Sequence, residues 1–154
     1  AKGIGTLAHL SKNELSIGIG PGWAERECEV VGSSFVKPAK SADEFCQLFT
    51  NLSSSPDEAW QVGPYSYRSS GFEPRLPART QLLVGGNSAA ARRRTAKWGD
   101  AWQPTGPSVE PMREVIVHLR QLSDLGGRDF SQSGMGLRLR VRPTSDESPH
   151  YVGD

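Results

Sequence analysis

The sequence has few of the features that mark several classes of protein. Its 154 residues contain only two cysteines, Cys28 and Cys46, which form no CxxC pair and stand near no cluster of histidines. We therefore expect two free thiols, buried or half buried in a reducing compartment, rather than a zinc site. No apolar run approaches the roughly 20 residues that span a bilayer, so we expect no membrane partner.

An excess of charge of one sign is also missing. Lys and Arg number 18 against 17 Asp and Glu, which leaves a net charge of +1. A balance this even gives no electrostatic reason to expect a nucleic-acid partner. The first residues, AKGIGTLAHL, contain neither the long apolar core of a signal peptide nor an initiator Met. We therefore expect a cytoplasmic chain that is a fragment of a longer protein.

The three histidines offer no catalytic set. His118 falls inside a predicted helix, His150 lies near the C-terminus, and His9 stands far from both. No Ser-His-Asp or Cys-His arrangement and no spacing of metal ligands can be argued from these positions. The sequence therefore assigns no catalytic residue and no metal.

What the sequence does contain is an alternation of short helices and strands. Ser41 is expected to cap one helix, because Glu44 completes a capping box, and Ser88 to cap another. Periodicity predicts helices over 2–10, 24–31, 41–52, 88–97 and 109–125, and strands over 15–19, 81–84, 101–103 and 137–141. Strands that alternate with helices indicate an α/β fold with a largely parallel sheet or barrel.

Residues 53–79 interrupt this alternation. The segment is rich in Ser, Pro and Gly. We expect a mobile excursion with one hairpin through Tyr65–Phe72, because loops of this length inside a compact domain are usually functional or mobile. We also expect this segment to lie near the mouth of the substrate site, because the loops around such a site carry specificity.

The first segment with binding chemistry is Gly18-Ile19-Gly20-Pro21-Gly22-Trp23. A strand, a glycine-rich turn and a helix allow backbone N–H groups to approach a phosphate. The spacing is GxGxG rather than the dinucleotide pattern GxGxxG, and Pro21 removes one donor. Two interpretations stay open: a nucleotide-binding turn, and a tight connection between a strand and a helix.

The second segment, Val84-Gly85-Gly86-Asn87-Ser88-Ala89, joins a strand to a helix through two glycines. Successive N–H groups converge there, and the helix dipole favours an anion. An ordinary strand-to-helix turn without a ligand is the alternative. A third segment, Trp98 to Pro104, places Asp100 and Trp102 around a short strand, where they could line a pocket or serve as turn and core residues.

Taken in order, these segments resemble the luciferase-like monooxygenase family, especially its bacterial members that depend on the deazaflavin coenzyme F-420. The ordered succession, which spans about residues 3–142, is specific. The residues that carry it are Thr6 to Ser11 (TLAHLS), Leu15 to Trp23 (LSIGIGPGW), Asp43-Glu44, Val84 to Arg93 (VGGNSAAARR), Gly99 to Pro104 (GDAWQP) and Gly127-Arg128-Asp129.

The resemblance implies a (β/α)8 barrel, which takes about 250 residues. This chain would supply the middle and C-terminal βα units over 1–142, followed by a frayed tail over 143–154. The expected function is that of a fragment of an oxidoreductase or monooxygenase that uses FMN or coenzyme F-420 on a small organic substrate. The residues implied in binding the cofactor are Gly85, Gly86, Asn87, Ser88, Gly20 and Trp102.

Several positions depart from the family pattern. Lys12-Asn13 replace two glycines, Glu14 stands where the family has Arg, and Ala101 replaces the glycine before the tryptophan. These departures keep two alternatives open: a non-catalytic relic or binding module that retains an anion site, and a nucleotide-binding α/β domain. Because an incomplete barrel exposes strand edges, the isolated chain is expected to form a homo-oligomer or to be molten or insoluble.

Overall fold

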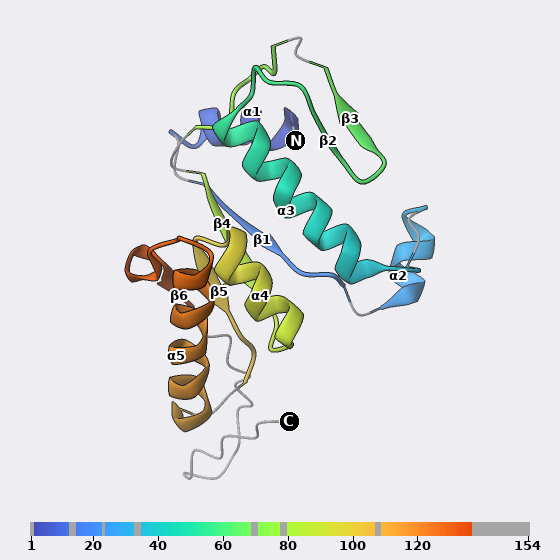
Figure 1. Ribbon diagram of the computed structural model, residues 1–154. Helices are drawn as coiled ribbons and strands as arrows, with labels where there is room; N and C mark the ends of the chain where they lie inside the picture. The colour runs from blue at the N-terminus through green and yellow to red at the C-terminus, as the bar shows by residue number, and fades with distance from the viewer. Residues whose placement is uncertain are drawn as a thin grey trace. The chain divides into compact units, whose positions relative to one another are not determined.

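The computed structural model describes residues 2–12, 15–22, 24–32, 35–68, 71–77, 80–106 and 109–136. The chain divides into two compact units, Ala1–Leu82 and Leu83–Asp154, and each unit is described by itself (Figure 1). The predicted strand over 137–141, the tail and Trp23 lie outside the described residues. Within them, no helix combines the length and the apolar character needed to cross a membrane.

Four predicted elements of the first unit are confirmed, with small shifts of their ends. They are helix α1 (Lys2–Leu10), strand β1 (Ser16–Ile19), helix α2 (Glu25–Val30) and helix α3 (Pro38–Ser54). The core of this unit forms where α3 turns one face inward: Cys46, Phe49 and Leu52 on that face are buried. Their spacing of three residues is that of a helical stripe.

The prediction that Ser41 caps α3 is wrong. The helix begins at Pro38 and its N-cap is Lys37. The Ser41 amide donates to the Lys37 carbonyl over 3.0 Å, so Ser41 lies within the helix. Proline is well suited to a first turn because its φ is already helical and it lacks an N–H that would have no partner there.

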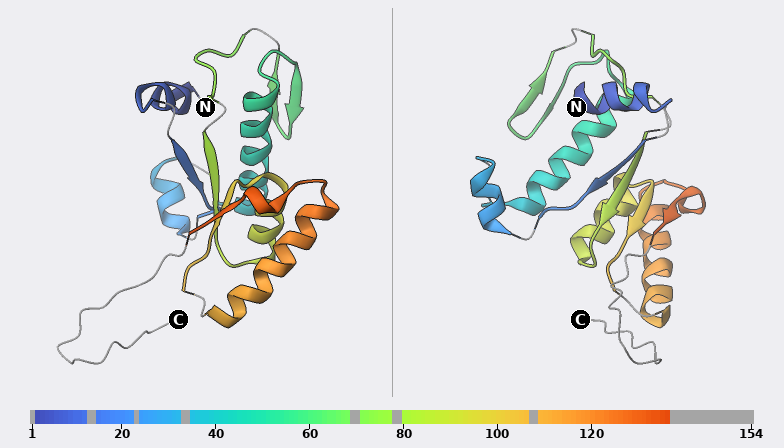
Figure 2. Two further views of the ribbon diagram at one scale, coloured as in Figure 1. Left: turned by 90° about the vertical axis from the view of Figure 1, so that its left-hand side faces the viewer. Right: turned by 180° about the vertical axis from the view of Figure 1, so that it is seen from behind.

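The hairpin lies earlier in the chain than predicted. Strand β2 (Trp60–Val62) pairs antiparallel with strand β3 (Tyr65–Tyr67), so the expected hairpin through Tyr65–Phe72 is wrong. Gly63 and Pro64 form the two-residue loop, and the φ of Gly63 is +53°, which favours glycine. Figures 1 and 2 show this hairpin beside α3, and the Tyr67 hydroxyl donates to the Pro56 carbonyl over 2.9 Å.

The rest of the 53–79 excursion packs within the first unit. Nε2 of His9, at the end of α1, lies 3.0 Å from the Arg75 carbonyl oxygen. The segment enters strand β4 (Gln81–Gly85) at Gln81, whose amide donates to the Leu15 carbonyl just before β1 over 2.9 Å. The excursion therefore ends at the amino end of β4. Its expected place near the substrate mouth stays a prediction.

The second unit repeats a strand-then-helix pattern, as predicted. Strand β4 runs parallel to β5 (Ala101–Gln103), and β5 runs parallel to β6 (Gly134–Met135), a short strand that periodicity did not predict. Helix α4 (Ala89–Trp98) connects β4 to β5, and helix α5 (Val109–Leu125) with the 3-10 turn η1 (Phe130–Gln132) leads to β6. The predicted α/β class with a parallel sheet is confirmed.

The core of the second unit lies between the strands and the two helices. Trp102, Leu119, Ala96 and Phe130 form one buried cluster, and α4 packs along α5 (Figure 2). Ala101, which departs from the family pattern, is accommodated because Gly134 faces it. A Cβ placed on Gly134 would lie only 3.3 Å from the Ala101 side chain.

Candidate functional site

The candidate site is the turn between β4 and α4, at the carboxyl end of the strand. Gly85 is the last residue of β4 and pairs with Gln103 of β5. Gly86 follows with a φ of +109°, in the region that L side chains rarely adopt. Its N–H donates to the Gln103 carbonyl over 3.2 Å. The Gly86 amide therefore holds the turn to β5 and is occupied within the protein.

Trp102 supports this turn from the core. Its side chain is buried, and its indole Nε1 donates to the Gly86 carbonyl over 2.9 Å. Since the ring is packed against Leu119 and Phe130, the hydrogen bond ties the turn to the rigid interior of the unit. Trp102 thus stands next to the predicted site and positions its backbone.

The next two residues are also fixed by hydrogen bonds. The Asn87 side chain donates to the Thr105 carbonyl over 2.7 Å and accepts from the Thr105 amide over 3.1 Å. Ser88 is the N-cap of α4, as predicted, and its hydroxyl oxygen accepts from the Ala91 amide over 3.1 Å. The sequence did not indicate that Thr105 fixes Asn87, because Thr105 does so through its backbone carbonyl and amide.

Three further backbone donors of the turn lie at the start of α4. The amides of Ser88, Ala89 and Ala90 have no hydrogen-bond partner among the residues that the structure describes. The first amides of a helix lack partners within it, and they point along its axis with the positive end of the dipole. No acidic residue lies in the first turn of α4. These groups fit a phosphate.

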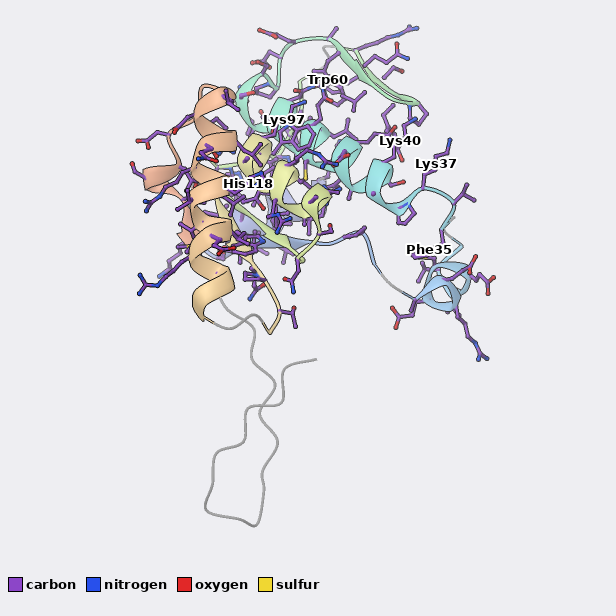
Figure 3. The ribbon with its side chains drawn as sticks, turned by 60° about the horizontal axis from the view of Figure 1, so that its bottom comes forward. Phe35, Lys37, Lys40, Trp60, Lys97 and His118 are labelled. Atoms are coloured by element: carbon purple, nitrogen blue, oxygen red, sulfur yellow. The ribbon has the colours of Figure 1, made fainter. Side chains whose placement is uncertain are left out.

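The three arginines that follow differ in their surroundings. Arg94 is 2% exposed and has an interaction partner, whereas Arg93 is exposed. Arg92 is half buried, and its Nε has no hydrogen-bond partner within the described part of the chain. Lys97, later in α4, lies 4.4 Å over the Trp98 ring (Figure 3). The first turn of α4 is therefore followed by positive charge.

Asp100 does not belong to the candidate site. It precedes β5, at the amino end of the strand, and its carboxylate lies 3.8 Å from Arg128. Arg128 also donates to the last carbonyls of α4, those of Thr95 and Ala96. The interpretation of Asp100 as a pocket-lining residue at the carboxyl ends is wrong, and its role as a turn residue is confirmed.

Gly20 belongs to the first unit, whereas the residues just described belong to the second. It is exposed after β1, and a Cβ placed on it would meet nothing within 4 Å. It borders a hollow of about 220 Å³ together with Cys28, Phe35 and Ser41. The structure thus brings together Gly85, Gly86, Asn87, Ser88 and Trp102, and describes Gly20 separately.

A metal centre is not found in the part of the chain that the structure describes. No three His, Cys, Asp or Glu side chains gather there as ligands. His118 lies on α5 (Figure 3).

The sequence is similar to those of known proteins. The family model described as luciferase-like monooxygenase matches residues 1–149. An uncharacterized protein of Mycobacterium tuberculosis is 27% identical over 128 residues, which cover 83% of this chain and 44% of that protein. An FMNH2-dependent dimethylsulfone monooxygenase of Pseudomonas fluorescens is 23% identical over 151 residues, which cover 96% of this chain and 41% of that protein.

A solved structure extends the likeness to the fold. An F420-dependent secondary alcohol dehydrogenase, in complex with an F420-acetone adduct, superposes with a TM-score of 0.75 at 14% identity. The match covers 90% of this chain and 43% of that one. The chain therefore has the fold of part of a (β/α)8 barrel and spans less than half the length of the relatives it matches.

Proposed function

The chain belongs to the luciferase-like monooxygenase family, and we propose that it is the cofactor-phosphate-binding part of a flavin- or deazaflavin-dependent oxidoreductase that acts on a small organic molecule. The observation that carries this proposal is the turn after β4. There, a glycine with a φ of +109° is followed by three helix-start amides that have no partner among the described residues. An FMNH2-dependent and an F420-dependent enzyme among the relatives support a cofactor of the flavin type.

The amides of Ser88, Ala89 and Ala90 would hold the phosphate of FMN or coenzyme F-420, and the Ser88 hydroxyl would add a donor. Asn87 and Trp102 do not need to touch the cofactor, since their hydrogen bonds to Thr105 and Gly86 fix the backbone around it. Once bound, the reduced cofactor supplies the redox chemistry, either hydride transfer or activation of oxygen. We assign no catalytic residue to this chain, because the groups on the substrate side are proposed to come from the βα units that relatives have beyond the matched part.

Titration of the chain with FMN and with riboflavin tests this function, because the two ligands differ only by the phosphate. A hydrogen bond to a charged group contributes about 1.5–3 kcal/mol, so FMN should bind at least roughly tenfold more tightly than riboflavin. Coenzyme F-420 is titrated in parallel to choose between the cofactors.

Gly86→Val should abolish the preference for FMN, because valine cannot adopt a φ of +109° without strain. Gly127→Val is the matched control: Gly127 also has a positive φ, +70°, but lies after α5 and not at the turn. If Gly86→Val keeps the wild-type affinity for both cofactors, the turn is only structural.

A further inference from the structure

A second cavity lies in the first unit, between α3 and the β2–β3 hairpin. Its volume is about 290 Å³, close to the lower end of the range for small-molecule sites. The side chains that shape it include Phe45, Leu48 and Phe49 of α3, Trp60 and Tyr67 of the hairpin, and Phe72. We call this cavity the hairpin pocket.

The walls of the hairpin pocket are aromatic and uncharged. Phe45 and Phe49 stack with ring centroids 6.2 Å apart on α3, and Trp60 and Tyr67 stack at 4.9 Å on the hairpin. Among the described residues that line it there is no Asp, Glu, Lys or Arg. An ion entering such a pocket would lose its hydration without gaining a partner, so the walls favour a neutral and largely apolar ligand.

The hairpin that closes the pocket is held in place without a ligand. A Cβ on Gly63, in the hairpin loop, would overlap the carboxylate of Glu44, so the loop is seated directly on α3. Glu44 also forms an ion pair with Lys40 one turn earlier, with 3.6 Å between the charged atoms. These contacts keep the pocket preformed, which lowers the entropic cost of binding.

One residue that lines the pocket, Trp60, carries a polar group without a partner in the described part of the chain. Nε1 of Trp60, labelled in Figure 3, is covered from water and makes no hydrogen bond within the described part of the chain. Tyr67, its stacking neighbour, is satisfied because its hydroxyl donates to Pro56. A buried donor without an acceptor is unfavourable. A small turn of the indole toward the pocket would let a bound molecule supply that acceptor.

We propose that the hairpin pocket binds a small, uncharged aromatic molecule that carries one hydrogen-bond acceptor, such as an aryl ketone. The ring would stack among Phe45, Phe49 and Trp60, and the carbonyl oxygen would accept from Trp60 Nε1. This site shares no residue with the proposed phosphate site, and its test does not depend on the cofactor.

The test uses three fluorinated probes and the whole chain: para-fluoroacetophenone, para-fluoroethylbenzene, which lacks the acceptor, and para-fluorobenzoate, which is charged. Binding is followed by saturation-transfer and fluorine NMR, which also work if the chain self-associates. We expect the ketone to bind about three- to tenfold more tightly than the hydrocarbon, as one neutral hydrogen bond allows. The benzoate should not bind.

Trp60→Phe should bring the affinity for the ketone down to that for the hydrocarbon, because it keeps a ring but removes the N–H. Leu48→Trp should fill the pocket and abolish binding of both, whereas Val117→Trp, the matched control on the exposed side of α5, should change nothing. Intermolecular NOEs between the wild-type Phe45 and Phe49 rings and the probe locate the site without any variant. Absence of these NOEs, equal binding of the benzoate, or an unchanged ketone preference in Trp60→Phe would overturn the proposal.

Discussion

Replacing Trp102 with phenylalanine removes the hydrogen bond by which the buried indole holds the glycine turn. The indole is 2% exposed, and its Nε1 donates to the Gly86 carbonyl over 2.9 Å. Phenylalanine keeps an aromatic ring beside Leu119 and Phe130 but cannot donate. We expect a loss of about 2–4 kcal/mol in the free energy of unfolding, from an unpaired carbonyl (about 1–3 kcal/mol) and a small cavity (on the order of 1 kcal/mol).

Urea unfolding followed by far-UV circular dichroism measures this loss, and Trp98→Phe is the matched control. Trp98 is also on the second unit and half buried, but its indole N–H makes no hydrogen bond within the described residues. A change within about 0.5 kcal/mol is expected there. Trp102→Phe should also reduce the preference for FMN over riboflavin, because the turn is no longer held. Equal losses in the two variants would refute the role of Trp102 in supporting the turn.

Three further substitutions probe other contacts. Gly63→Ala should lower the urea midpoint, because the new Cβ would overlap the Glu44 carboxylate and because the φ of Gly63 is +53°. The control is Gly71→Ala, which should lower the midpoint less, because Gly71 also has a positive φ but its Cβ would enter open space. Arg128→Met should cost about 1 kcal/mol in the same assay, because the last carbonyls of α4 lose their cationic donor, and an unchanged midpoint would contradict this. The hydroxyl and amide of Ser131 hold the pKa of Asp129 below its usual value, so its stabilising effect is present above pH of about 4 and is lost as the pH falls through the lowered pKa. In Asp129→Asn the urea midpoint should therefore decrease less below a pH of about 4 than it does in the wild type. An equally steep decrease in both proteins would contradict the role of Asp129.

The elements that the sequence predicted correctly are those whose signals are local. Ser88 caps α4 because a hydroxyl at that position meets the Ala91 amide three residues later, a relation that is visible in the spacing. Ser41 carried the same signal, with Glu44 behind it. The capping prediction failed there because Pro38 starts the helix earlier, and a residue inside a helix cannot cap it.

The parts that the sequence did not predict depend on contacts between distant residues. The hairpin was predicted too far along the chain because its loop is marked only by Gly63, a residue with a positive φ between two strands of three residues each. The stacking of Trp60 on Tyr67 arises only when these strands pair. For Asp100, the strand direction decides which end of the sheet it occupies. The Arg128 partner that explains its role is 28 positions away in the sequence.

The central claim, that the α4 start binds the cofactor phosphate, is tested most directly by changing the charge at Ser88 without losing the cap. Asp and Asn are both good N-caps, so Ser88→Asp and Ser88→Asn should both keep the stability of α4. Isothermal titration with FMN and riboflavin should then show that Ser88→Asp loses the preference for FMN, because its carboxylate repels the phosphate, whereas Ser88→Asn retains most of it. If Ser88→Asp binds FMN as tightly as Ser88→Asn does, the phosphate is not bound at this turn.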